Sequence, residues 1–135
     1  MKVYLTTLMH FSAAHRLSNP AFTEKQNYAV FGSCSNPSGH GHNYKLLVTV
    51  VGEPDPVTGM VIDLHKLKNI ISTSLVNLVD HKHLNVDVEF LNNINPTAEN
   101  LVIAFWKILK KELKDLLHEI ILYETDKQWV TYRGR

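Results

Sequence analysis

The chain has 135 residues, enough for one domain with a buried core, so we treat residues 1–135 as a single domain. A formal charge of +1 argues against a broad nucleic-acid surface, which needs a strong basic excess. No apolar stretch reaches the length of a membrane span, and the first residues show no signal-peptide pattern. The single cysteine cannot form an internal disulfide, so we expect a reducing, cytoplasmic setting.

The first half of the chain predicts two strands. Residues 2–16 contain β-branched and aromatic side chains and no helix breaker, and alternate positions form a largely apolar face that ends at His15. Residues 17–39 show no sustained period and predict an ordered, functional loop. Residues 42–52 are a second apolar run and predict the second strand.

The second half predicts two helices and a hairpin. Asp63 is a candidate N-cap for a helix that extends to Val79. Residues 80–85 end that helix as a loop. A second helix begins near Pro96 and Thr97, with Thr97 as its cap or with Asn95 as cap and Pro96 at the first helical position. Residues 119–124 and 128–132 predict two strands joined by a turn.

The resulting order, ββααββ, predicts an α+β fold with a four-stranded antiparallel sheet and two helices on one face. The terminal strands have no interior proline that would block pairing at their edges. Strand pairing between subunits is therefore expected.

Three histidines have the spacing of a metal site. His40 and His42 are two residues apart where a strand begins, so both side chains point to one face, and His15 ends the strand that would pair beside them. Three imidazoles leave a fourth position open, which is typical of catalytic zinc. The alternative is a hydrogen-bonded core histidine at position 15 and ordinary loop polarity at the other two.

Cys34 and the pair Asp80-His81 are candidates for proton transfer. Cys34 lies in a loop of glycine and asparagine and not in an apolar run, and a thiolate beside a cation or metal can act as a base. The alternative is a small buried side chain. Asp80 and His81 are adjacent at a helix end, where the alternative is a solvated helix terminus.

Glu124 shares its strand parity with Ile120 and Leu122, so this acid lies on an apolar face and needs a partner. A ligand with adjacent N–H groups suits the two carboxylate oxygens. Glu99 lies in the first turn of the second helix, where acids are favoured without any further role.

Six segments together resemble the family of 6-pyruvoyl-tetrahydropterin synthase and 6-carboxytetrahydropterin synthase of queuosine biosynthesis, and they run almost end to end. They are FSAAHRL (11–17), the Cys-x5-His-Gly-His-Asn-Tyr block (34–44), GEPDPVTGMVIDL (52–64), LVDHKHLN (78–85), PTAENL (96–101) and YETDKQWVTYRG (123–134).

The resemblance implies a zinc ion held by His15, His40 and His42. It implies Cys34 as catalytic base, with Asp80 and His81 as its partners in proton transfer. It implies that Glu124 anchors the pterin ring. Thr97 and Glu99 are further candidate substrate contacts, and Arg16, which follows His15, is a candidate contact for the triphosphate. The implied substrate is 7,8-dihydroneopterin triphosphate, a small-molecule partner from which triphosphate is lost.

The resemblance also implies the T-fold, in which subunits join edge to edge into a β-barrel and two trimers stack into a hexamer with active sites at the subunit interfaces. The five-residue spacing between Cys34 and His40 resembles the pyruvoyl enzymes, since the queuosine enzyme typically has three. Ser33 and Thr97-Ala98 depart from the Lys and Thr-Thr of animal pyruvoyl enzymes, and Pro96 to Glu99 looks more like the bacterial members.

We therefore predict a zinc-dependent lyase that makes 6-pyruvoyl-tetrahydropterin. The alternatives are a 6-carboxytetrahydropterin synthase, which uses the same substrate and releases acetaldehyde, and a non-catalytic pterin-binding oligomer. A zinc hydrolase is a third alternative, but it gives Cys34 no role.

Overall fold

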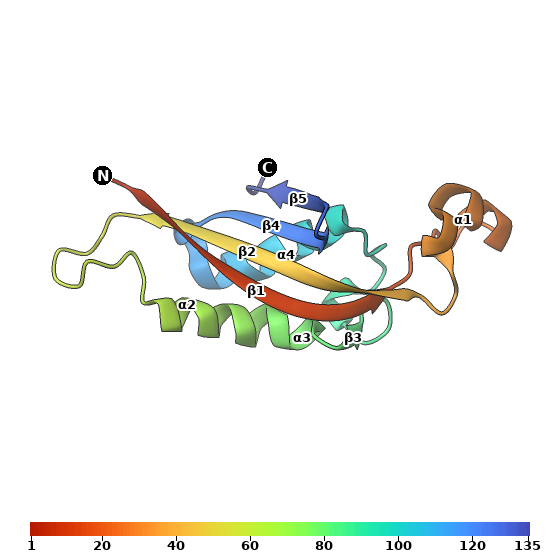
Figure 1. The fold of residues 1–135 in the computed structure, drawn as a ribbon, viewed down its shortest axis with the longest axis horizontal. Helices are drawn as coiled ribbons and strands as arrows, with labels where there is room; N and C mark the ends of the chain where they lie inside the picture. The colour runs from red at the N-terminus through yellow and green to blue at the C-terminus, as the bar shows by residue number, and fades with distance from the viewer.

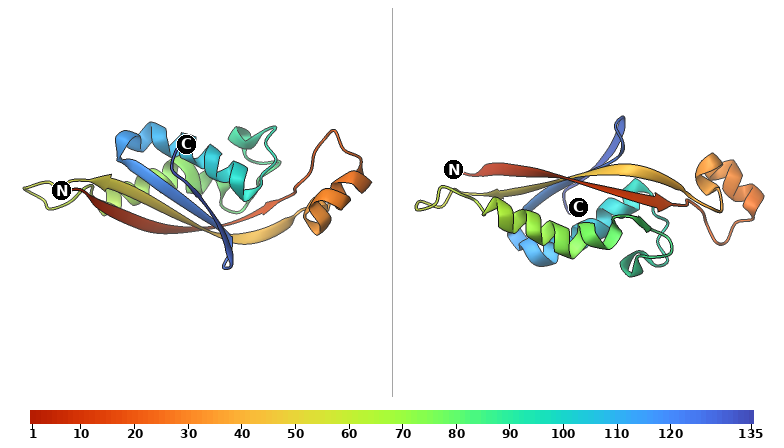
Figure 2. Two further views of the ribbon diagram at one scale, coloured as in Figure 1. Left: turned by 90° about the horizontal axis from the view of Figure 1, so that it is seen from above. Right: turned by 60° about the horizontal axis from the view of Figure 1, so that its bottom comes forward.

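The structure is a computed structural model that describes residues 1–135. The elements are, in order, β1 (Val3–His15), α1 (Glu24–Phe31), β2 (His40–Gly52), α2 (Leu64–Ile71), α3 (Asn77–Val79), β3 (Lys82–His83), α4 (Ala98–Leu113), β4 (Leu117–Thr125) and β5 (Gln128–Tyr132). The strands form one sheet in the order β3-β1-β2-β4-β5. Helices α2, α3 and α4 cover one face of it (Figures 1 and 2).

The two long strands β1 and β2 form the centre of the sheet. They pair antiparallel along their whole length, from Val3 opposite Gly52 to His15 opposite His40. On the helix side of the sheet, Tyr44, Leu46, Val48 and Val50 of β2 are fully buried. Alternation with a period of two therefore decides which side chains reach the core, as the sequence predicts for these strands.

The helices are capped and packed as predicted. The Asp63 side chain accepts from the His65 N–H at the start of α2, and the Thr97 side chain accepts from the Asn100 N–H at the start of α4. A π-helical turn, Ser72–Val76, joins α2 to α3, so this stretch is one continuous helical segment. The apolar faces of both helical segments reach the core, where the fully buried side chains include Leu67, Ile71, Leu75, Val79, Leu101, Phe105 and Leu109.

The sheet has five strands and not the predicted four, and it is not wholly antiparallel. The additional strand β3 pairs parallel to β1 at Ala13 and Ala14, within residues 80–85 that the sequence predicts as a loop. Two residues are too short to show a strand period, because strands usually need four to eight residues to be recognised. The main-chain groups that β1 leaves unpaired at its end provide the partner.

The predicted loop 17–39 contains the helix α1 and a 3-10 turn at Gly32–Ser35. Thr23 and Gln26 form a reciprocal capping box that starts α1. This helix buries only Asn27, because it projects beyond the end of the sheet (Figure 1), and it therefore lacks the apolar period that predicts a helix. None of the helices is long and apolar enough to cross a membrane.

Candidate active site

His15, His40 and His42 converge on one point of the sheet. The register places His15 directly opposite His40 and Ala13 opposite His42, so all three histidines point to the helix-covered face. One ring nitrogen from each lies within 4.8 Å of the others. His15 Nε2 and His40 Nε2 are 3.1 Å apart.

The orientation of His15 is set by the chain just before α4. Its Nδ1 lies 2.7 Å from the Pro96 carbonyl oxygen, which accepts a hydrogen bond from it. Because Nδ1 carries the proton, Nε2 has a free lone pair, and this lone pair points toward the other two histidines. His15 is fully buried, and burial lowers its pKa to about 4. The imidazole is therefore neutral at physiological pH, which is the form that binds metals.

The three imidazoles fit a metal ion. His42 Nε2 is buried and has no hydrogen-bond partner, and such a nitrogen costs free energy unless another group, such as a metal ion, binds it. Two nitrogens bound to a tetrahedral zinc at its usual bond length are about 3.3 Å apart, close to the separation between His15 and His40. Burial also lowers the pKa of His42.

Gly39 allows the second strand to approach the end of the first. Its φ of +76° suits glycine, and a Cβ at this position would lie 2.9 Å from both the His15 carbonyl oxygen and His83 Nε2. The residue before His40 is therefore restricted to glycine by both backbone conformation and space.

A cavity next to the histidines gathers three of the predicted substrate contacts. Its volume is about 360 Å³, and its lining residues are Leu17, Thr97, Ala98, Glu99, Glu124, Gln128, Trp129 and Val130. Glu124 Oε1 lies 3.5 Å from His42 Nε2, so this carboxylate connects the histidine cluster to the cavity. Volumes near this size accept small organic ligands.

Asp80 and His81 form a contact at the edge of β1. Asp80 Oδ1 accepts from the Ser12 N–H at 2.9 Å and lies 2.9 Å from His81 Nδ1. The main-chain N–H of His81 donates to the Ser12 carbonyl at 2.6 Å. This bond holds the backbone of His81 at a positive φ of 59°. The Ser12 N–H and then His81 lower the pKa of Asp80, so its carboxylate stays ionised beside an exposed imidazole.

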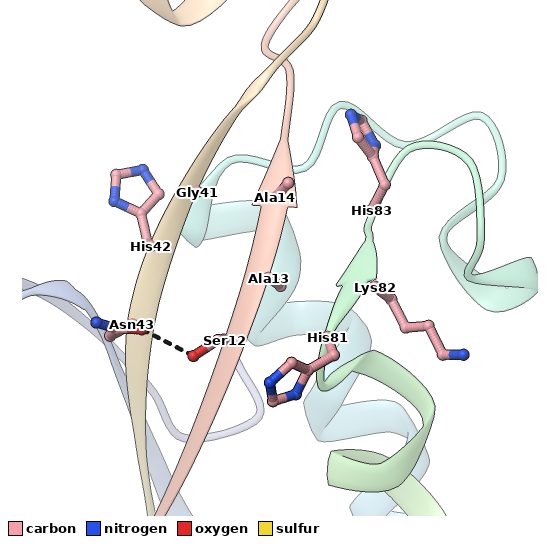
Figure 3. A pocket seen from close by; sticks show the side chains of 9 residues that line it. All are labelled: Ser12, Ala13, Ala14, Gly41, His42, Asn43, His81, Lys82 and His83. Atoms are coloured by element: carbon pink, nitrogen blue, oxygen red, sulfur yellow. Dashed lines mark hydrogen bonds between the residues drawn. The ribbon is translucent and has the colours of Figure 1, made fainter.

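His81 faces a second cavity on the other side of the strands. This cavity has a volume of about 440 Å³, and its lining includes Ser12, His42, Asn43 and His81. Figure 3 shows Ser12 hydrogen-bonded to Asn43, with His81 beside β1 and the His42 ring projecting from β2 away from it. Ser12 and Asn43 have the opposite strand parity from the metal-binding histidines. One chain therefore presents His81 and Glu124 in two different cavities, which share none of their lining residues.

Cys34 lies in the 3-10 turn Gly32–Ser35, is partly buried, and lines neither cavity. Its carbonyl oxygen accepts from the Leu17 N–H at 2.8 Å, which places the turn just beyond the end of β1. The structure thus brings His15, His40, His42 and Glu124 together and leaves Cys34 apart from the Asp80-His81 pair within one chain.

Sequence reasoning missed Pro96, Ser12 and Trp129 as parts of these sites. Pro96 and Ser12 act through main-chain groups, which any residue type carries, so the sequence contains no signal for them. Trp129 has a usable signal, because it lies directly across the predicted turn 125–127 from Glu124, and the structure shows it 54% exposed.

A sheet that places three imidazoles beside a cavity lined by carboxylates is the arrangement of a metal-dependent enzyme of the α+β class. Comparison with known proteins gives a finer assignment. Residues 4–135 match the family described as 6-pyruvoyl tetrahydropterin synthase. The chain belongs to this family, which confirms the resemblance found in the sequence.

Relatives cover nearly the whole chain. The 6-pyruvoyl tetrahydrobiopterin synthase of Poecilia reticulata is 46% identical over 97% of this chain and 90% of its own length. The Pongo abelii protein of the same name is 45% identical over 92% of this chain and 86% of its own. A solved 6-pyruvoyl tetrahydropterin synthase from Caenorhabditis elegans superposes with a TM-score of 0.94 at 39% identity, covering 100% and 97% of the two chains.

The comparisons also separate the two products considered above. The 6-carboxy-5,6,7,8-tetrahydropterin synthase of Aquifex aeolicus is 28% identical over 98% of this chain and 99% of its own length. This identity is well below that of the pyruvoyl relatives. The sequence identities therefore favour the pyruvoyl product, as does the five-residue spacing between Cys34 and His40.

Proposed function

We propose that the protein converts 7,8-dihydroneopterin triphosphate to 6-pyruvoyl-tetrahydropterin and releases triphosphate. The observation that carries the proposal is the cluster of His15, His40 and His42 beside the cavity of Glu124, in a chain that belongs to this family of lyases. A single free cysteine also fits a reducing, cytoplasmic setting.

The metal we propose is zinc, held by His15, His40 and His42. Zinc bound there would act as a Lewis acid toward negative charge that develops on the substrate's side-chain oxygens. Pro96 keeps His15 in the tautomer that has Nε2 free, and Gly39 lets His40 approach it. These residues prepare the site before any ligand arrives.

The pterin ring would occupy the cavity lined by Thr97, Glu99 and Glu124. The two oxygens of the Glu124 carboxylate suit the adjacent N–H groups of a pterin ring, because charge-assisted hydrogen bonds to two donors fix both position and orientation. Because Glu124 lies 3.5 Å from His42, a ring bound to it would lie next to the proposed metal site.

Cys34 is our candidate for the base that removes a proton from the carbon beside the pterin C=N bond, and His81 is our candidate for returning one. Asp80 holds the His81 ring by its contact with Nδ1. Repeated proton transfer of this kind moves the double bonds along the side chain until triphosphate can leave.

We infer that neighbouring subunits complete each site. Within one chain, His81 and Glu124 line different cavities, and Cys34 lines neither of them. β1 pairs with β3 at only two residues, and β5 has no partner on its outer side, so both edges have free main-chain groups for strand pairing. The assembly we propose is a barrel of edge-paired subunits in which two trimers stack as a hexamer.

Product analysis tests the proposal. The purified protein, loaded with zinc, is incubated with 7,8-dihydroneopterin triphosphate, and the products are identified by mass. Triphosphate and 6-pyruvoyl-tetrahydropterin are expected. Release of acetaldehyde would instead identify the 6-carboxytetrahydropterin synthase.

Absence of turnover in the wild type would favour a pterin-binding protein, and the variant Cys34→Ala tests whether the reaction needs the thiol. Loss of a positioned base lowers the rate by about 10²- to 10⁴-fold. The zinc content should remain unchanged, because Cys34 is not part of the histidine cluster. Unchanged turnover in this variant would favour a metal-centred reaction that needs no thiol.

A further inference from the structure

Arg16 lies where three segments meet at the end of β1. Its N–H donates to Asn85 Oδ1 at 2.8 Å, and its carbonyl accepts from Asn85 Nδ2 at 2.8 Å. The amide of Asn85 thus imitates one further residue of strand pairing beyond β3. This contact ties Arg16 to the segment that begins with Asp80 and His81.

The side chain of Arg16 points the other way, to the turn that carries Cys34. Nε donates to the Ser35 carbonyl at 2.8 Å, and Nη2 lies 3.1 Å from each carboxylate oxygen of Glu24 on α1. The next residue along the chain, Leu17, donates to the Cys34 carbonyl. Arg16 and its neighbour therefore bind the two successive carbonyls of Cys34 and Ser35.

The two side-chain contacts differ in strength. The Glu24 side chain is 72% exposed, and such exposed ion pairs contribute little to stability. The Arg16 side chain is only 22% exposed, and Ser35 is buried, so the hydrogen bond to the Ser35 carbonyl is shielded from water. Because the donor is charged, this bond is also stronger than a neutral one.

We propose that Arg16 is a positioning residue that holds the Cys34 turn against the end of β1, in register with the segment 80–85. The proposal rests on the proposed function, in which Cys34 is the base. Without this clamp the turn separates from β1, so the thiol becomes more accessible to solvent and less well placed for proton transfer.

This role makes a different demand on the side chain from the triphosphate contact that the sequence suggests. A clamp needs the planar guanidinium, whose Nε reaches Ser35 while Nη2 reaches Glu24, and a lysine with a single nitrogen cannot occupy both places. A contact with triphosphate needs mainly a positive charge, which lysine retains. Arg16→Lys therefore distinguishes the two roles.

The test compares Arg16→Lys and Arg16→Gln with the control Glu24→Gln, which removes only the exposed partner. Cys34 is the sole cysteine, so the rate of its alkylation by iodoacetamide under native conditions reports on this turn alone. Zinc content, the unfolding temperature, and kcat and KM with 7,8-dihydroneopterin triphosphate are measured on the same samples.

We expect both Arg16 variants to be alkylated about threefold faster or more, since accessibility limits the reaction of a partly buried thiol. We expect kcat to fall about tenfold, which corresponds to the loss of about 1.36 kcal/mol of transition-state stabilisation. Zinc should remain at one ion per chain, because Pro96 still orients His15. Glu24→Gln should stay within about twofold of the wild type on every measure.

Two results would overturn the proposal. One is an unchanged rate of Cys34 alkylation in Arg16→Lys. This result is sufficient by itself, even if Arg16→Gln does not fold. The other is a rise in KM alone in Arg16→Gln with wild-type behaviour in Arg16→Lys, which would assign Arg16 to the triphosphate. If alkylation accelerates but the wild type itself does not turn over the substrate, the clamp stands and the proposed activity fails.

Discussion

Glu124 lies between the metal-binding histidines and the cavity, and replacing it by glutamine separates its two possible roles. Its Oε1 is 3.5 Å from His42 Nε2, and its side chain is 21% exposed. Glutamine keeps the shape but replaces one acceptor oxygen by an NH₂ group, which would face an N–H of the pterin ring. A carboxylate that anchors the ring and one that supports the metal respond differently to this change.

The magnitude follows from the number of hydrogen bonds. A hydrogen bond to a charged group contributes about 1.5–3 kcal/mol, and Glu124→Gln loses one such bond and weakens a second. A net loss of about 3 kcal/mol corresponds to roughly a 100-fold weaker affinity for the pterin. Glu124 also raises the pKa of His42 against the effect of burial. Its neutralisation therefore favours the neutral imidazole, and zinc should be retained.

The assay measures zinc content by elemental analysis and pterin affinity by calorimetry on the same preparation. Glu119→Gln is the matched control, because Glu119 lies on the same strand and binds Arg133 at 2.8 Å outside the cavity. Loss of zinc with unchanged pterin affinity in Glu124→Gln would refute the anchoring role and assign Glu124 to the metal.

Three further predictions concern the same region. In the metal-free protein, the pKa of His15 lies at about 4 against an ordinary 6.5, so the unfolded chain binds more protons between these values. Unfolding free energy should therefore rise with pH through this window, by about 3 kcal/mol at most, in denaturant titrations, and a flat profile would contradict the assigned burial. Pterin binding should quench the fluorescence of Trp129, which lines the cavity, and Trp129→Phe should abolish the quenching while the buried Trp106 remains as an internal control. Gly39→Ala should weaken zinc binding about tenfold or more and lower the unfolding temperature, because its Cβ would meet the His15 carbonyl; metal affinity equal to that of the wild type would contradict this.

The parts of the fold that the sequence predicts well are those in which hydrophobic period and burial coincide. The strands around Phe11, Tyr44 and Leu122 and the helices around Leu67 and Phe105 all have one face in the core, and each appears where the pattern predicts it. The helix caps Asp63 and Thr97 are confirmed by their hydrogen bonds, because capping is a local interaction between neighbouring residues.

The elements that the sequence does not predict are those held by contacts other than core burial. The helix α1 buries only Asn27, so no apolar period marks it. The strand β3 is held because the Ser12 and Ala14 carbonyls accept from the main-chain N–H groups of His81 and Leu84, while the Ser12 N–H donates to Asp80 Oδ1. Carbonyl and N–H groups of the main chain leave no mark in the sequence. The same limit applies to the clamp at Arg16: its charge is visible in the sequence, but its direction depends on the path of the turn 32–35.

The metal site shows why the pairing of β1 with β2 has to be fixed to one register. His15 and His40 face each other as a cross-strand pair, and His42 is two residues further along the same face. A slip of one residue would turn one strand's histidines to the opposite face and leave His15 without partners. The buried side chains of Phe11 and Tyr44, stacked with ring centroids 4.7 Å apart, lock this register just beneath the site. Most of the geometry for binding a metal is therefore present before the metal arrives, because the same core contacts that fold the sheet also aim the three imidazoles.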